Sequence, residues 1–303
     1  MSMREQFVRT TTAAMDADPE VALVLAEISL DRFTDALDRH AERVFNVGIR
    51  EQAMVGVAGG LALAGMRPVL HSITPFLVER PFEQLKLDLG HQGVGAIAVS
   101  TGASYDYPAA GRTHMAPGDV ALIDALPGWT AHVPGHPDEV DALLSREFDH
   151  DGLVYLRLSD RVNAEPLVSG PGWHQVRHGR DGVVLAVGPM LDPVLAATAA
   201  MDVTVLYTAT IRPFDAAGLR AAVRQAAPDV VLVEPYLRGT STREVAEALS
   251  DTPHRVLSLG VRRDLELRAY GTVEEHDAAH GLGPTAIAGE VAHFLHGVRN
   301  RAA

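Results

Sequence analysis

A short apolar run turns into a long helical pattern in the stretch Val44-Phe45-Asn46-Val47-Gly48-Ile49-Arg50-Glu51-Gln52-Ala53-Met54. Gly48 allows a tight bend between the two parts, and the helical pattern continues to about Ala64. Glu51 falls in the first helical turn, where a carboxylate interacts favourably with the helix dipole. The same place lies at the carboxyl end of a strand, where ligands bind in α/β sheets. The stretch therefore predicts a strand–turn–helix unit, and it leaves a structural and a ligand-binding role open for Glu51.

The composition limits the classes of protein that the chain can belong to. Its 303 residues, 47% of them hydrophobic, are enough for two globular domains. A net charge of −13 without a long basic run makes nucleic acid and anionic membranes improbable partners. The chain has no cysteine, which excludes disulfides, thiolate catalysis and cysteine metal sites. There is no membrane-length apolar run and no signal-peptide core, so we expect a soluble cytoplasmic protein.

Strand and helix patterns alternate along the whole chain. Apolar runs predict strands at 21–26, 67–73, 94–100, 129–134, 153–158, 183–188, 203–207, 230–234 and 255–259, with helical patterns between them. This alternation predicts two tandem doubly wound α/β domains with mostly parallel sheets. Residues 163–180 are rich in Pro, Gly and polar residues and are expected to form a linker between a domain at 1–162 and a smaller one at 181–303.

Three chemically suggestive residues follow predicted strands of the first domain. Glu51 follows the short strand, Phe76 lies in the loop after the next strand, and His114 lies in a glycine-rich loop at 101–118. Such loops converge at one edge of a parallel sheet. An acid, an aromatic ring and an imidazole at that edge suit a flat heteroaromatic ligand. A surface role remains the alternative for a lone histidine.

Several well-known site motifs are missing. The glycines at 56, 59 and 60 lie inside the predicted helix, so they do not form a dinucleotide-binding turn. There is no phosphate loop and no His-Glu-x-x-His metal motif. A Ser-His-Asp hydrolase stays open, although the chain lacks a Gly-x-Ser-x-Gly elbow.

The order of several motifs resembles the transketolase family over nearly the whole chain. The stretch at 44–54 is similar to the pyrimidine-domain signature of that family, and further similar segments lie at 59–68, 75–77, 82–84, 113–114, 125–129, 210–215 and 280–283. The family uses thiamine diphosphate. The resemblance implies a pyrimidine-binding domain followed by a transketolase C-terminal domain.

The resemblance also implies roles for individual residues. Glu51 would hydrogen-bond a nitrogen of the cofactor's aminopyrimidine ring and so activate the cofactor, and Phe76 would stack on that ring. His114 would bind substrate and assist proton transfer. Glu27 falls where the family often has an acid near the thiazolium, and Arg157 aligns loosely with an arginine that binds substrate phosphate.

The chain departs from the family pattern in two respects. It has no Gly-Asp-Gly motif for diphosphate and Mg²⁺, and it contains no metal site that we can predict. We therefore expect the C-terminal subunit of a split transketolase, active only with an N-terminal partner subunit in an α2β2 heterotetramer. In the substrate loop, Gly102 and Ala110 replace a His and an Asp of sugar-phosphate transketolases, and the role of Tyr105-Asp106-Tyr107 cannot be assigned.

The expected activity is transfer of a two-carbon ketol or acyl unit from a small keto donor to an aldehyde or keto acceptor. A β subunit of a 2-oxo acid dehydrogenase-type decarboxylase would have the same two domains. A deoxyxylulose phosphate synthase-like subunit is a further alternative. A regulatory or scaffold subunit without chemistry is the alternative outside the enzymes, and the joint presence of Glu51, Phe76 and His114 argues against it.

Overall fold

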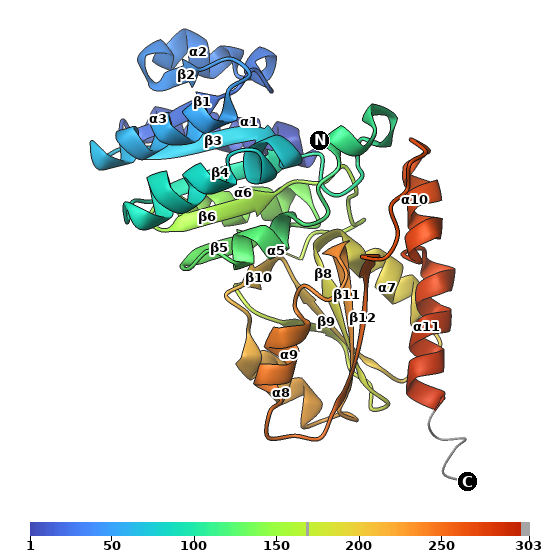
Figure 1. Cartoon of the computed structure of the whole chain (residues 1–303). Helices are drawn as coiled ribbons and strands as arrows, with labels where there is room; N and C mark the ends of the chain where they lie inside the picture. Colours follow the sequence, from blue (N-terminus) through green and yellow to red (C-terminus); the bar gives the residue numbers. More distant parts are fainter. Residues whose placement is uncertain (168–169, 298–303) are drawn as a thin grey trace.

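Two twisted sheets lie next to each other in the computed structural model, which describes residues 1–167 and 170–297 (Figure 1). The first sheet has the strand order β10-β5-β6-β4-β3-β1-β2, and the second has the order β12-β11-β8-β9-β7. Most neighbouring strands are parallel, and helices cover the sheets. The predicted fold of two tandem doubly wound α/β domains is therefore confirmed.

The first sheet is buried on both faces. Its strands are β1 (Val21–Leu25), β2 (Val44–Asn46), β3 (Arg67–Ile73), β4 (Ala96–Thr101), β5 (Trp129–His132), β6 (Leu153–Arg157) and β10 (Thr210–Arg212). Leu23 packs in the core cluster that contains residues of α1 and α6, whereas Val24 packs in the cluster that contains residues of α3. Both faces need apolar side chains, which explains the unbroken apolar run of β1.

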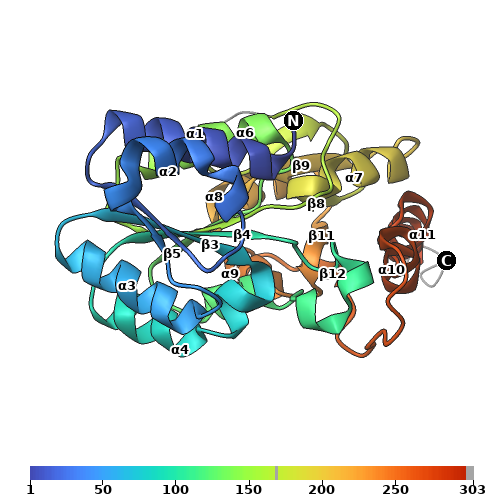
Figure 2. The same ribbon diagram turned by 90° about the horizontal axis from the view of Figure 1, so that it is seen from above.

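Helices flank the first sheet on two sides. They are α1 (Met3–Ala17), α2 (Thr34–His40), α3 (Glu51–Leu63), α4 (Phe82–Gln84), α5 (Asp119–Asp124) and α6 (Pro137–Glu147). Figure 2 shows α1, α2 and α6 on one side, and α3 and α4 on the other. Two π-helical turns, at Pro75–Glu79 and Leu85–His91, surround α4. The turn at Pro75–Glu79 directly follows β3 and positions one of the candidate residues.

The second sheet repeats this arrangement on a smaller scale. Its strands are β7 (His174–Arg177), β8 (Val183–Val187), β9 (Thr204–Thr208), β11 (Asp229–Leu237) and β12 (Arg255–Val261). Its helices are α7 (Leu191–Ala197), α8 (Ala216–Val223), α9 (Thr242–Ala248), α10 (Val273–His280) and α11 (Pro284–His296). Side chains of α8 and α9 fill one core cluster, and those of α7 and α11 fill the other.

Two strands differ from the sequence-based expectation. The expected linker at 163–180 contains β7, which pairs antiparallel with β9 at the edge of the second sheet, while residues 168 and 169 lie outside the described part. β7 is largely polar because an edge strand is half exposed. β10 follows β9 in the sequence but pairs antiparallel with β5, so the second unit completes the first sheet. Sheet pairing therefore joins the two domains.

α10 was not expected, and the final helix predicted to reach residue 298 is described as far as His296. Within residues 1–167 and 170–297, every helix is too short or too polar to cross a membrane.

Candidate functional site

Glu51 is buried where β2 turns into α3. Gly48 has a φ of 72°, which accommodates the turn, and the Arg50 N–H donates to the Gly48 carbonyl at 2.7 Å. α3 then begins at Glu51, whose side chain is 1% exposed. Its Oε1 lies 3.4 Å from the Ser72 hydroxyl of β3, a long contact that satisfies the oxygen only weakly. The carboxylate therefore needs a stronger partner.

Arg80 provides that partner, and it also contacts Phe76. Its Nη1 donates to Glu51 Oε2 at 2.5 Å. Its guanidinium carbon lies 4.1 Å from the centre of the Phe76 ring, in cation–π geometry. The π-helical turn after β3 positions both residues, and Arg80 is 36% exposed. The acid and the aromatic ring are thus bridged by one guanidinium.

His114 completes the cluster from the loop at 101–118. Its ring centre lies 5.1 Å from that of Phe76, with the rings inclined by 71°. A 3₁₀ turn at Arg112–His114 positions the imidazole, which is half-buried and hydrogen-bonded through Nδ1 to the Thr113 hydroxyl at 3.0 Å. Glu51, Phe76 and His114, which the sequence analysis placed at one sheet edge, therefore form a continuous cluster through Arg80.

Sequence reasoning missed Arg80. Its spacing of four residues from Phe76 is a helical spacing, which brings two side chains onto one face. That spacing was a usable signal, but the contact with Glu51 joins positions 29 residues apart. A pairing of that range cannot be read from a local pattern.

Glu27 lies at the carboxyl end of β1, next to the turn that leads to Glu51. It is exposed and has a positive φ of 69°. Its N–H donates to Asn46 Oδ1 at 3.1 Å, and its Oε1 accepts from Asn46 Nδ2 at 3.0 Å. Its hydrogen bonds thus go to Asn46 in β2. It occupies the same sheet edge but not the cluster itself.

Arg157 lies away from the cluster and is 1% exposed. Its Nε donates to Asp119 Oδ2 at 2.6 Å, and its Nη2 donates to the Ser104 hydroxyl at 2.6 Å. A buried arginine with a carboxylate partner has no free face for a substrate phosphate. The expected substrate role of Arg157 stays a prediction that this geometry does not favour, because the pair would have to open.

The Tyr105-Asp106-Tyr107 segment has structural contacts that its sequence did not reveal. The Tyr105 hydroxyl donates to Asp277 in α10 at 2.6 Å. Asp106 Oδ2 accepts from the backbone N–H groups of Ala103 and Asp160, each at 2.9 Å. Burial raises the pKa of Asp106 to about 6, and the hydrogen bond from the Asp160 backbone N–H opposes the shift. The Tyr105–Asp277 hydrogen bond connects the loop at 101–118 to the second domain, whereas Asp106 connects the loop to Asp160.

Tyr107 fills the space beside Gly102. A Cβ at Gly102 would lie 2.3 Å from the Tyr107 ring, and Gly102 has a φ of 73°. The Tyr107 hydroxyl is hydrogen-bonded to Thr101 at 3.1 Å. The space beside Gly102, the residue that replaces a His of sugar-phosphate transketolases, is therefore filled by the Tyr107 ring.

Family comparisons agree with the arrangement of the two domains. The description "Transketolase, pyrimidine binding domain" matches residues 1–163, and "Transketolase, C-terminal domain" matches residues 172–287. An uncharacterised 33.6 kDa protein in the fasciation locus of Rhodococcoides fascians is 53% identical over 95% of this chain and 93% of its own length. A 6-deoxy-6-sulfo-D-fructose transketolase subunit of Clostridium sp. (strain MSTE9) is 32% identical over 71% of this chain and 67% of that subunit.

Longer relatives and a solved structure extend the comparison. The chain spans about half the length of the 1-deoxy-D-xylulose-5-phosphate synthases that it matches, 46% for that of Synechococcus sp. (strain CC9605) at 27% identity. A solved split-gene transketolase, described as an inactive β4 tetramer, has a TM-score of 0.84 and 25% identity, covering 97% of this chain and 98% of that one. The chain therefore belongs to the transketolase family and has the two-domain arrangement of a split transketolase-like subunit.

Proposed function

We propose that this chain supplies the pyrimidine half of a thiamine diphosphate site in an enzyme that transfers a two-carbon ketol or acyl unit. The observation that carries the proposal is the buried Glu51 carboxylate at the start of α3, joined through Arg80 to the Phe76 ring. When bound, the cofactor supplies an electron sink for breaking and forming carbon–carbon bonds. We assign this half-site to the domain at 1–162 and the C-terminal domain to residues 181–303.

The residues of the cluster fit an aminopyrimidine ring. Glu51 Oε2 is within reach of a ring-nitrogen partner, since it already accepts a hydrogen bond from a nitrogen of the flat Arg80 group. Phe76 offers a face on which a flat ring can stack. Burial of Glu51 excludes water and strengthens its hydrogen bond to the ring. The proposed role of Glu51 is to hold that nitrogen and to move a proton through it, which activates the cofactor.

His114 and the remaining candidates are placed around this core. His114 packs against Phe76 and remains partly exposed, so its proposed role is to bind substrate oxygens and carry protons. Glu27, at the same sheet edge, is proposed to lie near the thiazolium part. We keep Arg157 as a proposed substrate residue only for a state in which its pair with Asp119 opens.

Arg80 acts as a placeholder in this proposal. Its guanidinium makes two contacts that an aminopyrimidine would also make, a hydrogen bond to Glu51 and a stack on Phe76. The Arg80 guanidinium and an aminopyrimidine ring cannot occupy this place at the same time. We therefore propose that Arg80 keeps the buried Glu51 charge paired until the cofactor binds, and that it swings toward solvent on binding.

The proposal includes a partner subunit that binds the diphosphate and Mg²⁺. Two observations support it: no Gly-Asp-Gly motif is present in this sequence, and the similar split-gene transketolase is described as an inactive β4 tetramer. An α2β2 heterotetramer is the proposed assembly, with one cofactor site shared between each pair of unlike chains. The partner is proposed to carry the Gly-Asp-Gly motif.

The test combines reconstitution with a variant of Glu51. The chain is purified alone and with a co-expressed Gly-Asp-Gly partner, and two-carbon transfer from ketose phosphates to aldehydes is measured. We expect activity only in the complex. In the complex, Glu51→Gln should abolish activity and strongly slow the exchange of the C2 proton of the cofactor with solvent. Full turnover by the isolated chain, or normal C2 proton exchange in Glu51→Gln, would refute the proposal.

A synthase-like reaction is the second candidate function. The relatives named 1-deoxy-D-xylulose-5-phosphate synthase favour it, with 27% identity over 95% of this chain in one case. A 2-oxo acid donor loses CO₂ during the reaction, whereas a ketose donor does not. Release of CO₂ by the reconstituted pair, with formation of a ketose product, would therefore select the synthase-like reaction over ketol transfer.

A further inference from the structure

A separate cavity lies between the loop at 101–118 and the second domain. We call it the junction pocket, and its volume is about 380 Å³. Its lining includes Tyr105, Arg112, Leu237, Val261, Glu266 and His276. Leu237 and Val261 are the last residues of the neighbouring parallel strands β11 and β12. The carboxyl ends of parallel strands and the junctions between domains are common places for ligand sites.

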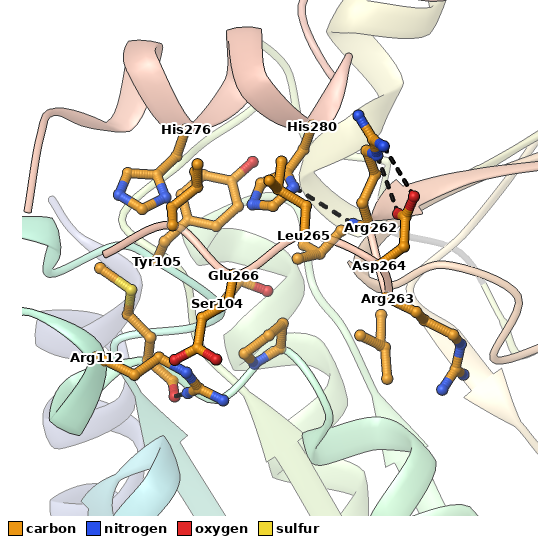
Figure 3. A pocket seen from close by; sticks show the side chains of 15 residues that line it. Ser104, Tyr105, Arg112, Arg262, Arg263, Asp264, Leu265, Glu266, His276 and His280 are labelled. Atoms are coloured by element: carbon orange, nitrogen blue, oxygen red, sulfur yellow. Dashed lines mark hydrogen bonds and ion pairs between the residues drawn. The ribbon is translucent and has the colours of Figure 1, made fainter. Parts of the chain in front are cut away.

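A stack of aromatic rings forms one wall of the junction pocket. The Tyr105 ring lies 5.0 Å from that of His276 and 5.6 Å from that of His280, at interplanar angles of 19° and 29° (Figure 3). The Tyr105 hydroxyl is held by Asp277, which also accepts two hydrogen bonds from Arg161. The wall is therefore fixed before any ligand arrives, which lowers the entropic cost of binding.

Charged groups line the rest of the pocket. Arg112 uses Nη1 to donate to the Met115 carbonyl, and its charge acts at longer range on the Glu79 carboxyl, where it opposes the rise in pKa that burial causes. An arginine has five N–H donors, so several remain for a ligand. Arg262 is paired with Asp264 at 2.9 Å and is thus neutralised, while Glu266 lies on the same side of the pocket as Arg112 in Figure 3.

Arg263 adds a second positive charge to the lining of the pocket. Its Nε donates to the Arg238 carbonyl at 2.7 Å, and no ion pair to it is found among residues 1–167 and 170–297. The lining thus contains two arginines, Arg112 and Arg263, and one acid, Glu266, outside the Arg262–Asp264 pair, although Figure 3 shows Arg263 extending away from Arg112. In a chain of net charge −13, such a local excess of positive charge attracts an anion.

We propose that the junction pocket binds a small amphiphilic anion, with its carboxylate or phosphate on Arg112 and its apolar part between the ring stack and Leu237. Apolar lining residues such as Leu237, Val261 and Leu265 would bury that part. This proposal does not rest on the proposed thiamine diphosphate site, because none of the residues that carry it belongs to the Glu51 cluster. A small anion without an apolar part would bind more weakly.

Binding at this pocket would act on the loop that carries His114. Arg112 and His114 belong to the same 3₁₀ turn. A Cβ at Gly111, which precedes that turn, would lie 2.5 Å from the ring of Tyr270, so the segment after β12 already touches the loop. A ligand that binds Arg112 from the pocket would therefore restrict the motion of the 3₁₀ turn that contains His114.

The test uses the full chain and four probes. Phenyl phosphate and phenylacetate represent the two anion sources, inorganic phosphate represents the charge alone, and benzyl alcohol represents the ring alone. Calorimetric titration should show saturable binding of at least one of the two amphiphilic probes, and weaker binding of phosphate and benzyl alcohol. In NMR spectra of the ¹⁵N-histidine-labelled chain, the signals of His276 and His280 should shift. The signal of His40, which contacts Asp16 in the first domain, should not shift.

Matched variants locate the site. Arg112→Gln should weaken binding by about tenfold or more, because it removes a charge-assisted hydrogen bond. Arg180→Gln is the control, since Arg180 is 80% exposed and far from the pocket lining. Circular dichroism establishes that both variants are folded. Equal binding by Arg112→Gln and the intact chain, shifts confined to other histidines, or no saturable binding of either amphiphilic probe would each overturn the proposal.

Discussion

Replacement of Arg80 by alanine tests the arrangement of the Glu51 cluster most directly. The change removes the 2.5 Å hydrogen bond to Glu51 and the guanidinium that lies 4.1 Å from the Phe76 ring centre. Glu51 is 1% exposed and would retain only the 3.4 Å contact with Ser72. The variant therefore leaves a buried carboxylate almost without a partner.

The expected loss of stability follows from these two contacts. A hydrogen bond to a charged group contributes about 1.5–3 kcal/mol, and an exposed cation–π contact about 0.5–1 kcal/mol. Because Arg80 is 36% exposed, solvent screens its charge and reduces the sum. We expect Arg80→Ala to lower the free energy of unfolding by about 1–3 kcal/mol.

The expected effect on the cofactor has the opposite sign. If the pyrimidine ring binds as proposed, it has to displace Arg80 from Glu51 and Phe76 in the intact chain, whereas in the variant that place is free. If about 1.4 kcal/mol of the contact energy no longer opposes binding, affinity for thiamine diphosphate increases about tenfold. Arg80→Lys, which keeps the charge but lacks the flat group, should lie between the two.

Two measurements check these expectations. Urea unfolding of the chain gives the stability change from the midpoint at constant slope. Calorimetric titration of the reconstituted complex gives the cofactor affinity. Arg180→Ala serves as the control because Arg180 is 80% exposed and its ion pair with Asp202 measures 3.3 Å. Unchanged stability together with weaker cofactor binding in Arg80→Ala would show that Arg80 is a ligand for the cofactor rather than its competitor.

Four further substitutions test the surrounding structure. Burial raises the pKa of Glu234 from 4.5 to about 7, so the folded state binds this proton more tightly and the free energy of unfolding should fall by about 3 kcal/mol as pH rises through that range. Glu234→Gln should abolish this slope in urea unfolding at a series of pH values. Arg157→Met should cost about 3–5 kcal/mol because it leaves the buried Asp119 without a positively charged partner, with only the Tyr155 hydroxyl as donor, and adding Asp119→Leu should recover part of the loss in the same assay. Gly48→Ala should cost only about 1–2 kcal/mol by thermal unfolding, since φ is 72° but the nearest atom, Oε1 of Glu27, is 4.0 Å away.

Continuous apolar runs made most strands predictable. β1 and β8 are buried along their whole length, so every residue is apolar and the sequence pattern is strong. β7 lies at a sheet edge with half-exposed polar residues, and β10 has three residues and a partner in the other domain. Neither β7 nor β10 has a local apolar pattern that predicts a strand, because each is placed by pairing with residues far away in the sequence. The linker predicted at 163–180 includes β7 for this reason.

The candidate site was predictable where one residue follows one strand. Glu51, Phe76 and His114 each follow a strand, and the parallel sheet brings such positions to one edge. The interactions of these side chains could not be predicted in the same way. The partner of Glu51 is Arg80, and the partner of Arg157 is Asp119, 38 positions away. A sequence shows that an arginine is present, but it does not show whether a buried carboxylate already neutralises it.

The second domain contributes to the geometry of the site in the first. β10 extends the first sheet beyond β5, and the Ser104 hydroxyl donates to the Pro235 carbonyl of β11 at 2.6 Å. Near the other end of the loop at 101–118, the Leu237 N–H donates to the Pro117 carbonyl at 2.7 Å. The loop is therefore attached to the second domain at two points, and between them it carries His114 against Phe76. Any shift of the second domain would move the base of this loop. Because substrate-binding groups must be held closely in position for catalysis, we infer that the second domain positions the imidazole as well as completing the fold.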